Sequence, residues 1–215
     1  MNSNCKIEKI RKKLWDYYGT LHWWPAETPF EVCIGAILTQ NTAWKNVEKA
    51  IENLKNADIL SCKGILDADL SFLAELIKPS GYFNQKAKKL KEFCRFLKEN
   101  YNCDLKMFFN SGPVKDLRNK LLSIWGIGRE TADSILLYAG NKKIFVVDAY
   151  TKRIFSRHGI CDEKIDYDEL RLLIENSIPE SAEIYNEFHA GLVYIGKDFC
   201  SRKNPLCEKC PLKGV

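Results

Sequence analysis

The sequence has few of the features that would place a protein in a membrane, outside the cell or in a disordered state. No apolar run approaches the roughly 20 residues that a membrane-spanning helix needs. The first residues, MNSNCK, contain no apolar core of a secretory signal, so we expect a cytoplasmic protein. There is no low-complexity segment and no internal repeat. The 33 basic and 28 acidic side chains leave a net charge of only +5, which by itself indicates a nucleic-acid partner weakly.

The composition that remains is that of an ordinary globular protein. The 215 residues can bury a core as one or two domains, and 46% of them are hydrophobic and 28% charged. Six of the nine cysteines have no spacing that indicates a disulfide framework. We expect most of these six to be buried small apolar residues: Cys5, Cys33, Cys62, Cys94, Cys103 and Cys161.

Apolar residues recur at helical spacing along most of the chain. Ile7, Ile10 and Leu14 begin this pattern, and it continues through residues 32–54, 72–97, 135–155 and 170–193. Prolines and glycines divide it into separate helices. The run at residues 144–147 is the one strand-like segment, and it is too isolated to form a sheet. The sequence therefore predicts an all-α fold.

One segment combines a helix, a Gly-x-Gly turn and a second helix. It spans residues 121–132, with Gly126 and Gly128 at the turn, and Asp148 follows a short apolar run about twenty residues later. A Gly-x-Gly turn lets backbone N–H groups approach a phosphate with no side chain between them. The alternative is a plain tight turn between packed helices, with Asp148 as the cap of the helix that follows it.

The sequence contains two runs of basic residues, one before this segment and one after it. We expect the first to be a solvated helix face: Lys86, Lys88, Lys89, Lys91 and Arg95. The second flanks Asp148 close to the Gly-x-Gly turn, which favours contact with phosphates: Lys142, Lys143, Lys152, Arg153 and Arg157.

The segment at residues 127–132 with Val147 and Asp148 resembles the helix-hairpin-helix, Gly/Pro, Asp motif of the endonuclease III superfamily of DNA glycosylases. The resemblance extends in order from Trp23 to Cys210. It implies a two-domain helical fold with a cleft and a C-terminal cysteine loop. The expected domains are 22–135, a six-helix bundle with the hairpin, and 136–215, a C-terminal helical domain joined by an N-terminal helix at 1–21. The implied partner is double-stranded DNA with a flipped-out base, and a monomer is usual for the family.

The resemblance assigns the chemistry to Asp148 and Glu130. A carboxylate at Asp148 can stabilise the oxocarbenium character of the transition state and assist the attacking water. Family members that also cleave the DNA backbone have a lysine at the position of Glu130, and glutamate cannot form their Schiff base. We therefore predict a monofunctional glycosylase. The alternatives are a bifunctional glycosylase and lyase, with Lys45 or Lys152 reaching into the site, and a non-catalytic DNA-binding module.

Further residues match positions at which the family contacts DNA. Gln40 corresponds to a glutamine that fills the gap left by the flipped-out base, although a polar helix junction explains it equally well from composition. Gly126, Gly128, Arg129 and Lys152 are the other expected DNA contacts. Trp125 stands where the family often has proline, and it could pack on a sugar or fill the core. His189 matches a family histidine for which we expect a structural role.

Tryptophans indicate the class of base. Trp23, Trp24 and Pro25 precede the first helix of the expected bundle, and Trp44 follows Gln40. Indole rings stack well on positively charged alkylated purines such as 3-methyladenine. These residues resemble the 3-methyladenine glycosylase branch, and the alternative is packing in the core or between domains.

Three C-terminal cysteines have a spacing typical of metal ligands. Cys200, Cys207 and Cys210 reproduce the first three ligands of the family's 4Fe-4S loop, and zinc is the other metal that such thiolates suit. The family pattern has a fourth cysteine after five further residues, and the sequence stops with those five. We predict a structural 4Fe-4S cluster; a non-cysteine ligand or a loop without a cluster are the alternatives.

Overall fold

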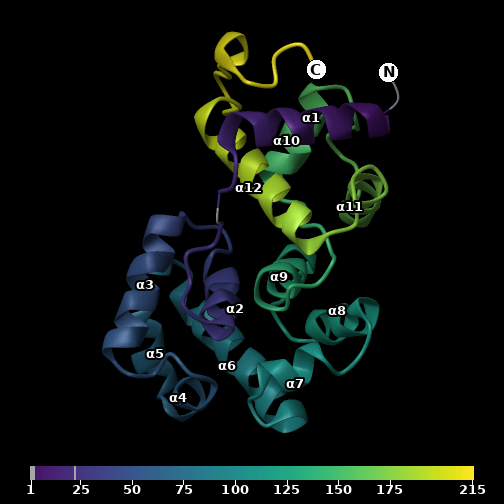
Figure 1. The fold of residues 1–215 in the computed structure, drawn as a ribbon. Coiled ribbons are helices and arrows are strands. Elements are labelled where there is room, and N and C mark those ends of the chain that lie inside the picture. Colours follow the sequence, from purple (N-terminus) through teal and green to yellow (C-terminus); the bar gives the residue numbers. More distant parts are fainter. Residues whose placement is uncertain (1–2, 22) are drawn as a thin grey trace. The chain divides into compact units, whose positions relative to one another are not determined.

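The computed structural model describes residues 3–21 and 23–215, and within these ranges the secondary structure is helical with no strand (Figure 1). The all-α prediction is confirmed. Residues 1 and 2, in the predicted N-terminal segment, and residue 22, at the predicted start of the bundle, lie outside the described residues. Residues 144–147 have no regular secondary structure, and all four side chains are buried. No helix in the described part of the chain is both long and apolar enough to cross a bilayer.

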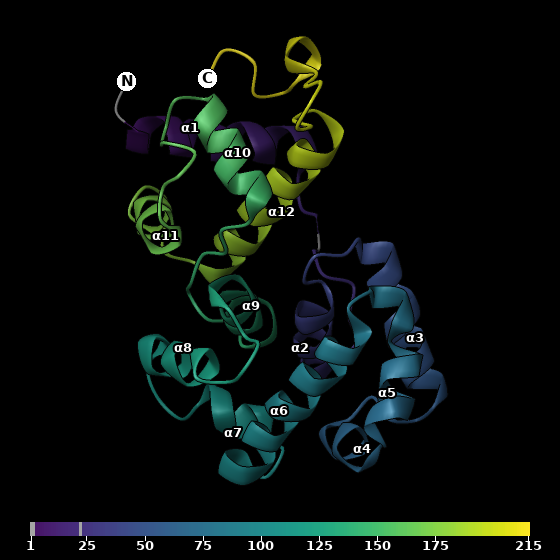
Figure 2. The same cartoon turned by 180° about the vertical axis from the view of Figure 1, so that it is seen from behind.

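The chain divides into two compact units, which Figure 2 shows from behind. The first unit combines Met1–Pro25 with Asn141–Val215, and the second is Ala26–Gly140. The first contains α1 (Ser3–Tyr18), α10 (Ala149–Arg157), α11 (Tyr167–Glu175), α12 (Ala182–Asp198) and the 3₁₀ turn η3 (Cys207–Lys209).

The second unit contains the remaining helices. They are α2 (Pro29–Leu38), α3 (Trp44–Asn56), α4 (Cys62–Asp67), α5 (Leu70–Leu76), η1 (Lys78–Ser80), α6 (Phe83–Tyr101), α7 (Leu105–Phe109), α8 (Val114–Leu122), α9 (Arg129–Ser134) and η2 (Ile135–Ala139). The last of these is a π-helical turn that directly continues α9.

Helix α2 is the central helix of the second unit. Thr28 caps its N-terminus by accepting a hydrogen bond from Glu31 N at 3.1 Å, and Pro29 supplies a preset backbone angle at the first turn. Every residue from Glu31 to Leu38 is buried. The helix packs against α3, α6, α9 and η2, which is why its sequence is apolar on all sides.

Helix α12 organises the first unit. It packs against α10 and α1, and α1 also contacts α11. The crossing with α10 is close, because a Cβ atom built at Gly196 would lie 2.2 Å from Tyr150 Cδ1. Glycine at this position therefore lets the helix that leads to the cysteine loop lie against the helix that begins after Asp148.

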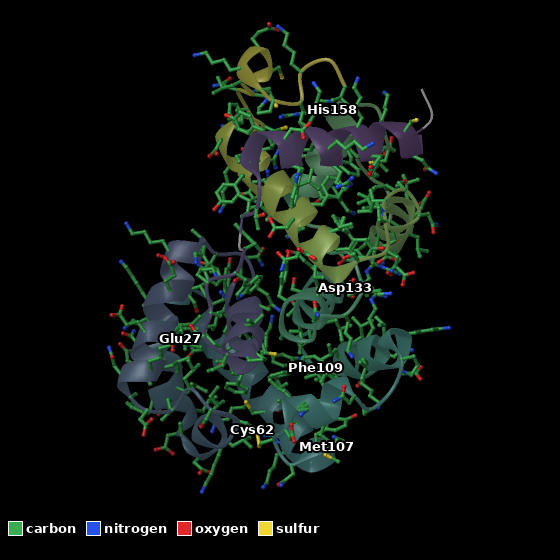
Figure 3. The ribbon with its side chains drawn as sticks, viewed as in Figure 1. Glu27, Cys62, Met107, Phe109, Asp133 and His158 are labelled. Carbon is green, nitrogen blue, oxygen red and sulfur yellow. A yellow bond between two sulfur atoms is a disulfide. The ribbon has the colours of Figure 1, made fainter. Side chains whose placement is uncertain are left out.

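The two helices of the hairpin segment are joined by a buried ion pair. Asp133 of α9 is 0% exposed, and Figure 3 labels its position. It accepts two hydrogen bonds from Arg118 of α8, from Nε to Oδ1 at 2.6 Å and from Nη2 to Oδ2 at 3.1 Å. This bidentate geometry is the strongest form that an arginine–carboxylate contact takes. It holds α8 and α9 together on either side of the Gly-x-Gly turn.

Two cysteines that we expected to be unpaired form a disulfide. Cys62 at the start of α4 is bonded to Cys103 just after α6, with 5.8 Å between their Cα atoms (Figure 3). The expectation for these two was wrong, because a sequence separation of 41 residues leaves no local signal of the pairing. Cys33 and Cys94 are buried as expected, whereas Cys5 is exposed and Cys161 is partly exposed.

The first basic run was also misinterpreted. Only Lys88 and Arg95 are exposed, as a solvated face requires. Lys86 is 2% exposed and donates to the carbonyl oxygens of Leu38 and Ser80. Lys91 donates to the carbonyls of Leu66 and Ala68. The inward lysines of α6 therefore satisfy backbone acceptors at the ends of neighbouring helices.

Candidate functional site

The Gly-x-Gly turn has the geometry of a tight hairpin. Gly126 has a φ of +85°, which favours glycine, and a Cβ atom there would lie 2.5 Å from Lys89 Cγ. Gly128 is the N-cap residue of α9 and has open space where a Cβ would be. Trp125 is 54% exposed, so it does not fill the core. Arg129 and Glu130 are exposed in the first turn of α9.

Gln40 is bonded to this hairpin. Its Nε2 donates to Gly126 O at 3.1 Å and to Thr131 Oγ1 at 3.0 Å, and its Oε1 accepts from Lys89 Nζ. The structure thus brings together three segments of the second unit that are far apart in the sequence. Sequence reasoning missed Lys89 and Thr131 in this cluster.

Asp148 lies where the buried segment at residues 144–147 meets α10. Its Oδ1 caps the helix by accepting from Thr151 N at 2.7 Å and Thr151 Oγ1 at 2.8 Å. Its Oδ2 lies 3.8 Å from Nε2 of His189 on α12. Burial lowers the pKa of His189, and the Asp148 carboxylate opposes this shift. The capping role of Asp148 is therefore observed, and one of its oxygens is left for other interactions.

The segment before Asp148 donates two backbone hydrogen bonds to side chains of α11. Phe145 N donates to Glu175 Oε1 at 2.8 Å, and Val147 N donates to the Tyr167 hydroxyl at 3.3 Å. Both acceptors are side chains because the segment has no neighbouring strand to pair with. These bonds determine where the chain enters α10 and hence where Asp148 lies in the first unit.

The basic residues of α10 bind carbonyl groups of the first unit. Lys152 Nζ donates to Ile165 O at 2.8 Å. Arg153 donates to Cys200 O and Gly196 O, at 2.7 and 3.1 Å. Arg157 donates to Ser201 O and Arg202 O, at 2.7 and 2.9 Å. These contacts tie the start of the cysteine loop to α10.

The tryptophans fall in different units. Trp23 and Trp24 belong to the first, and Trp44 belongs to the second, where its Nε1 donates to Glu48 Oε1 at 2.9 Å. The ring of Trp23 lies edge-on to Tyr194, with 5.6 Å between ring centroids, and Lys197 Nζ lies 5.4 Å from the Trp23 centroid. Trp24 has a φ of +78°, a left-handed conformation that is rare for a bulky residue.

Sequence reasoning missed three buried polar atoms of the first unit. Trp23 Nε1, the Tyr18 hydroxyl and Asn186 Oδ1 have no hydrogen-bond partner among the described residues. Tyr18 also packs against Tyr194, with 5.6 Å between ring centroids, and burial raises the pKa of its hydroxyl to about 12. Buried polar atoms are normally hydrogen-bonded, so this aromatic cluster is chemically suited to gain a polar ligand.

The three C-terminal cysteines lie near one another beyond α12. Cys200 is buried, and its Sγ accepts a hydrogen bond from Arg157 Nη1 at 3.1 Å. Burial raises the pKa of Cys210, and the neighbouring Cys200 and Cys207 raise it further. Three cysteine thiols in the segment that follows α12 are donors of the kind that iron–sulfur clusters and zinc take, so the donor set fits a thiolate-ligated group. In the described residues no three His, Cys, Asp or Glu side chains converge on one point suited to a single metal ion.

Comparisons with known proteins agree on one family. Residues 34–180 match the model of the HhH-GPD superfamily base excision DNA repair protein. A candidate DNA repair glycosylase of Methanocaldococcus jannaschii is 54% identical over 207 residues, which cover 96% of this chain and 94% of the relative.

Two solved structures are similar along most of the chain. The Helicobacter pylori 3-methyladenine DNA glycosylase bound to 1,N6-ethenoadenine has a TM-score of 0.75 and 32% identity, covering 92% of this chain and 98% of that protein. A non-covalent endonuclease III–DNA complex has a TM-score of 0.84 and 22% identity, covering 99% and 94%, which shows a shared fold.

Proposed function

We propose that this chain, which belongs to the HhH-GPD superfamily of base excision DNA repair proteins and is a DNA glycosylase, releases alkylated purines without cutting the DNA backbone. The observation that carries the proposal is a combination in the sequence: it has Asp148, and a glutamate, Glu130, stands at the position where lyases of the family have their lysine. The chain keeps the carboxylate that assists water and has no amine at that position to attack the sugar.

The proposed reaction is a hydrolysis at the sugar C1′. The bond between C1′ and the base nitrogen breaks, and its electron pair leaves with the base. The cationic sugar is stabilised by Asp148 Oδ2, because Oδ1 is already bound to Thr151. Water then attacks C1′ and gives up a proton to the carboxylate, which leaves an abasic site.

Trp23 and Trp24, with Pro25, are the proposed base-binding residues of the first unit, and Trp44 is the proposed aromatic contact in the second unit. The ring of Trp23 already attracts the ammonium of Lys197, which illustrates the affinity of an indole face for positive charge. An alkylated purine carries such a charge. The similarity to a glycosylase solved with 1,N6-ethenoadenine also favours a modified purine.

We propose that DNA is bound by the hairpin and its neighbours. Gly126 and Gly128 would offer backbone N–H groups to a phosphate, and the exposed Arg129 would add a positive charge beside them. Lys152, in the first unit, would bind a phosphate after it gives up or shares its present hydrogen bond to Ile165 O. Gln40 would occupy the gap in the duplex after the base is flipped out.

Cys200, Cys207 and Cys210 are the proposed ligands of a 4Fe-4S cluster. The cluster would supply a structural link that orders the loop after α12, with Arg157 donating a hydrogen bond to Cys200 Sγ. Arg202 and Lys203 on the same loop would then lie where phosphates can reach them. A purified protein that is brown and contains iron and sulfide would support this site, whereas a colourless protein with stoichiometric zinc would contradict it.

A base-release assay on duplex DNA containing 3-methyladenine tests the function. Free base is measured directly, and strand breaks are scored with and without alkali. We expect base release with breaks appearing only after alkali. Asp148→Asn should slow release by about 100- to 10,000-fold while DNA binding is kept. Breaks without alkali, or a covalent adduct trapped by borohydride, would show a bifunctional enzyme instead.

A further inference from the structure

The unexplained feature of the second unit is the inward-facing lysine at position 89. Lys89 belongs to the basic run of α6, yet its Nζ donates to Gln40 Oε1 instead of facing solvent. Its aliphatic stem packs on the hairpin, where a Cβ atom at Gly126 would lie 2.5 to 2.8 Å from Lys89 Cγ, Cδ and Cε. One side chain therefore touches both the hairpin glycine and the proposed gap-filling residue.

We propose that Lys89 is the positioning residue of Gln40: it fixes the orientation of the Gln40 amide and couples it to the hairpin. The inference rests on the proposed role of Gln40 and deepens it. Nothing in the proposed chemistry requires Lys89 to touch the substrate, so it acts through Gln40 alone.

Hydrogen-bond chemistry allows only one orientation of this amide. An ammonium group has donors and no acceptor, so it must face the amide oxygen. The carbonyl of Gly126 has only acceptors, so it must face the amide nitrogen, at 3.1 Å. Thr131 Oγ1 accepts a second hydrogen bond from the same nitrogen, at 3.0 Å. A flipped amide would place donor against donor and acceptor against acceptor.

A second lysine of α6 supports the loop that carries Gln40. Lys86, one turn earlier on α6, is buried and bonded to the carbonyls of Leu38 and Ser80, and Leu38 is the last residue of α2 before the Gln40 loop. Burial lowers the pKa of Lys89, and burial together with the nearby Lys89 charge lowers the pKa of Lys86 to about 8. The two lysines thus support the loop and the glutamine from the same helix face.

A preorganised Gln40 has less rotamer freedom to lose when it enters the duplex. Loss of the Lys89 bond should therefore slow the step in which the base leaves the stack, with a smaller effect on overall DNA affinity. Immobilising one flexible side chain corresponds to about a 3- to 10-fold change. The expected signature is a slower flipping step with nearly unchanged binding.

The test compares Lys89→Met with Lys88→Met in the full chain. Both variants remove one positive charge from α6, but Lys88 is exposed and takes no part in the cluster. Flipping is followed by the fluorescence of 2-aminopurine next to the lesion, and base release is measured in single turnover. We expect Lys89→Met to slow both by about 3- to 10-fold, and Lys88→Met to match the unmodified protein.

The same substitutions in a Gln40→Ala background make the test decisive. If Lys89 acts through Gln40, Lys89→Met has no further effect there. An effect that persists in that background, or equal rates for the Lys89 and Lys88 variants, would overturn the proposal. Unchanged flipping and release in Gln40→Ala alone would instead remove the proposed role of Gln40. If Lys89→Met does not fold, Lys89→Arg replaces it, and its effect must vanish in the same background.

Discussion

Glu130 is the residue on which the proposed reaction type depends. It is exposed in the first turn of α9, so its side chain can be exchanged at little cost to the fold. Glu130→Lys would supply an amine at the position that the family's lyases use. We predict a covalent enzyme–DNA adduct after borohydride treatment of this variant, and none with Glu130→Gln. Adducts of equal yield from the unmodified protein would show that another lysine already serves as nucleophile.

His189 predicts how stability depends on pH. Because burial lowers its pKa in the folded state, the unfolded chain binds the proton more readily. The free energy of unfolding should therefore fall as the pH drops through the ordinary histidine value of about 6.5. Burial also lowers the pKa of His158, which acts in the same direction. We expect His189→Gln to make the decline between about pH 7 and pH 5 shallower, measured by denaturant unfolding.

The contact with Asp148 supplies an internal check on this prediction. The carboxylate raises the pKa of His189 and so partly offsets the effect of burial. Asp148→Asn removes that compensation, and its stability should fall more steeply in acid than that of the unmodified protein. If the free energy of unfolding of His189→Gln falls with pH as steeply as that of the unmodified protein, His189 does not control the loss of stability in acid.

At the scale of elements, the hairpin depends on the ion pair between α8 and α9. Asp133 is fully buried, and the Arg118 guanidinium bonds both of its oxygens. Removing one partner leaves the other charge buried, which typically costs about 3–5 kcal/mol. We predict a loss of this size for Asp133→Asn in denaturant unfolding, together with weaker DNA binding.

The double variant separates the ion pair from simple packing. Arg118→Met with Asp133→Leu replaces both charges by apolar groups, and it should recover part of the stability lost in Asp133→Asn. Lys88→Met is the surface control and should change the free energy of unfolding by less than about 0.5 kcal/mol. If the double variant is less stable than Asp133→Asn, the ion pair stabilises the fold by more than the mutual neutralisation of two buried charges.

The helices and the hairpin could be predicted from local patterns, and the bonds between them could not. Apolar spacing is a property of neighbouring residues, so it indicated the all-α fold directly. The partners of Gln40 are 49 to 91 positions away in sequence, and no local pattern contains them. The disulfide of Cys62 and Cys103 was missed for the same reason.

The lysines of α6 carried a signal that was misinterpreted. Lys86 and Lys89 lie at helical spacing with Leu90 and Phe93, which places them on the buried face. Lys88 and Arg95 fall off this stripe and are exposed. Reading the run as charges alone predicted a solvated face, whereas its register against the apolar residues would have separated Lys86 and Lys89 from Lys88 and Arg95.

At the scale of the whole molecule, cysteine chemistry differs between the two units. The disulfide lies entirely in Ala26–Gly140, and the three clustered cysteines lie in the unit that contains Asn141–Val215. The disulfide closes a sequence separation of 41 residues. In the chain-entropy model such a loop stabilises the folded state by up to about 4 kcal/mol. A reductant should therefore lower the thermal midpoint.

Substitutions decide whether this bond causes the effect. Cys62→Ala with Cys103→Ala should have a lowered thermal midpoint that no longer responds to reductant, whereas Cys5→Ser, at an exposed cysteine outside the disulfide, should respond as the unmodified protein does.

A count of free thiols tests the disulfide directly. Of the nine cysteines, two form the bond and seven are free thiols, so alkylation of the denatured, unreduced chain should add seven labels, and nine after reduction. Nine labels without reductant would mean that the chain folds with both thiols reduced, and its stability would then come from packing alone.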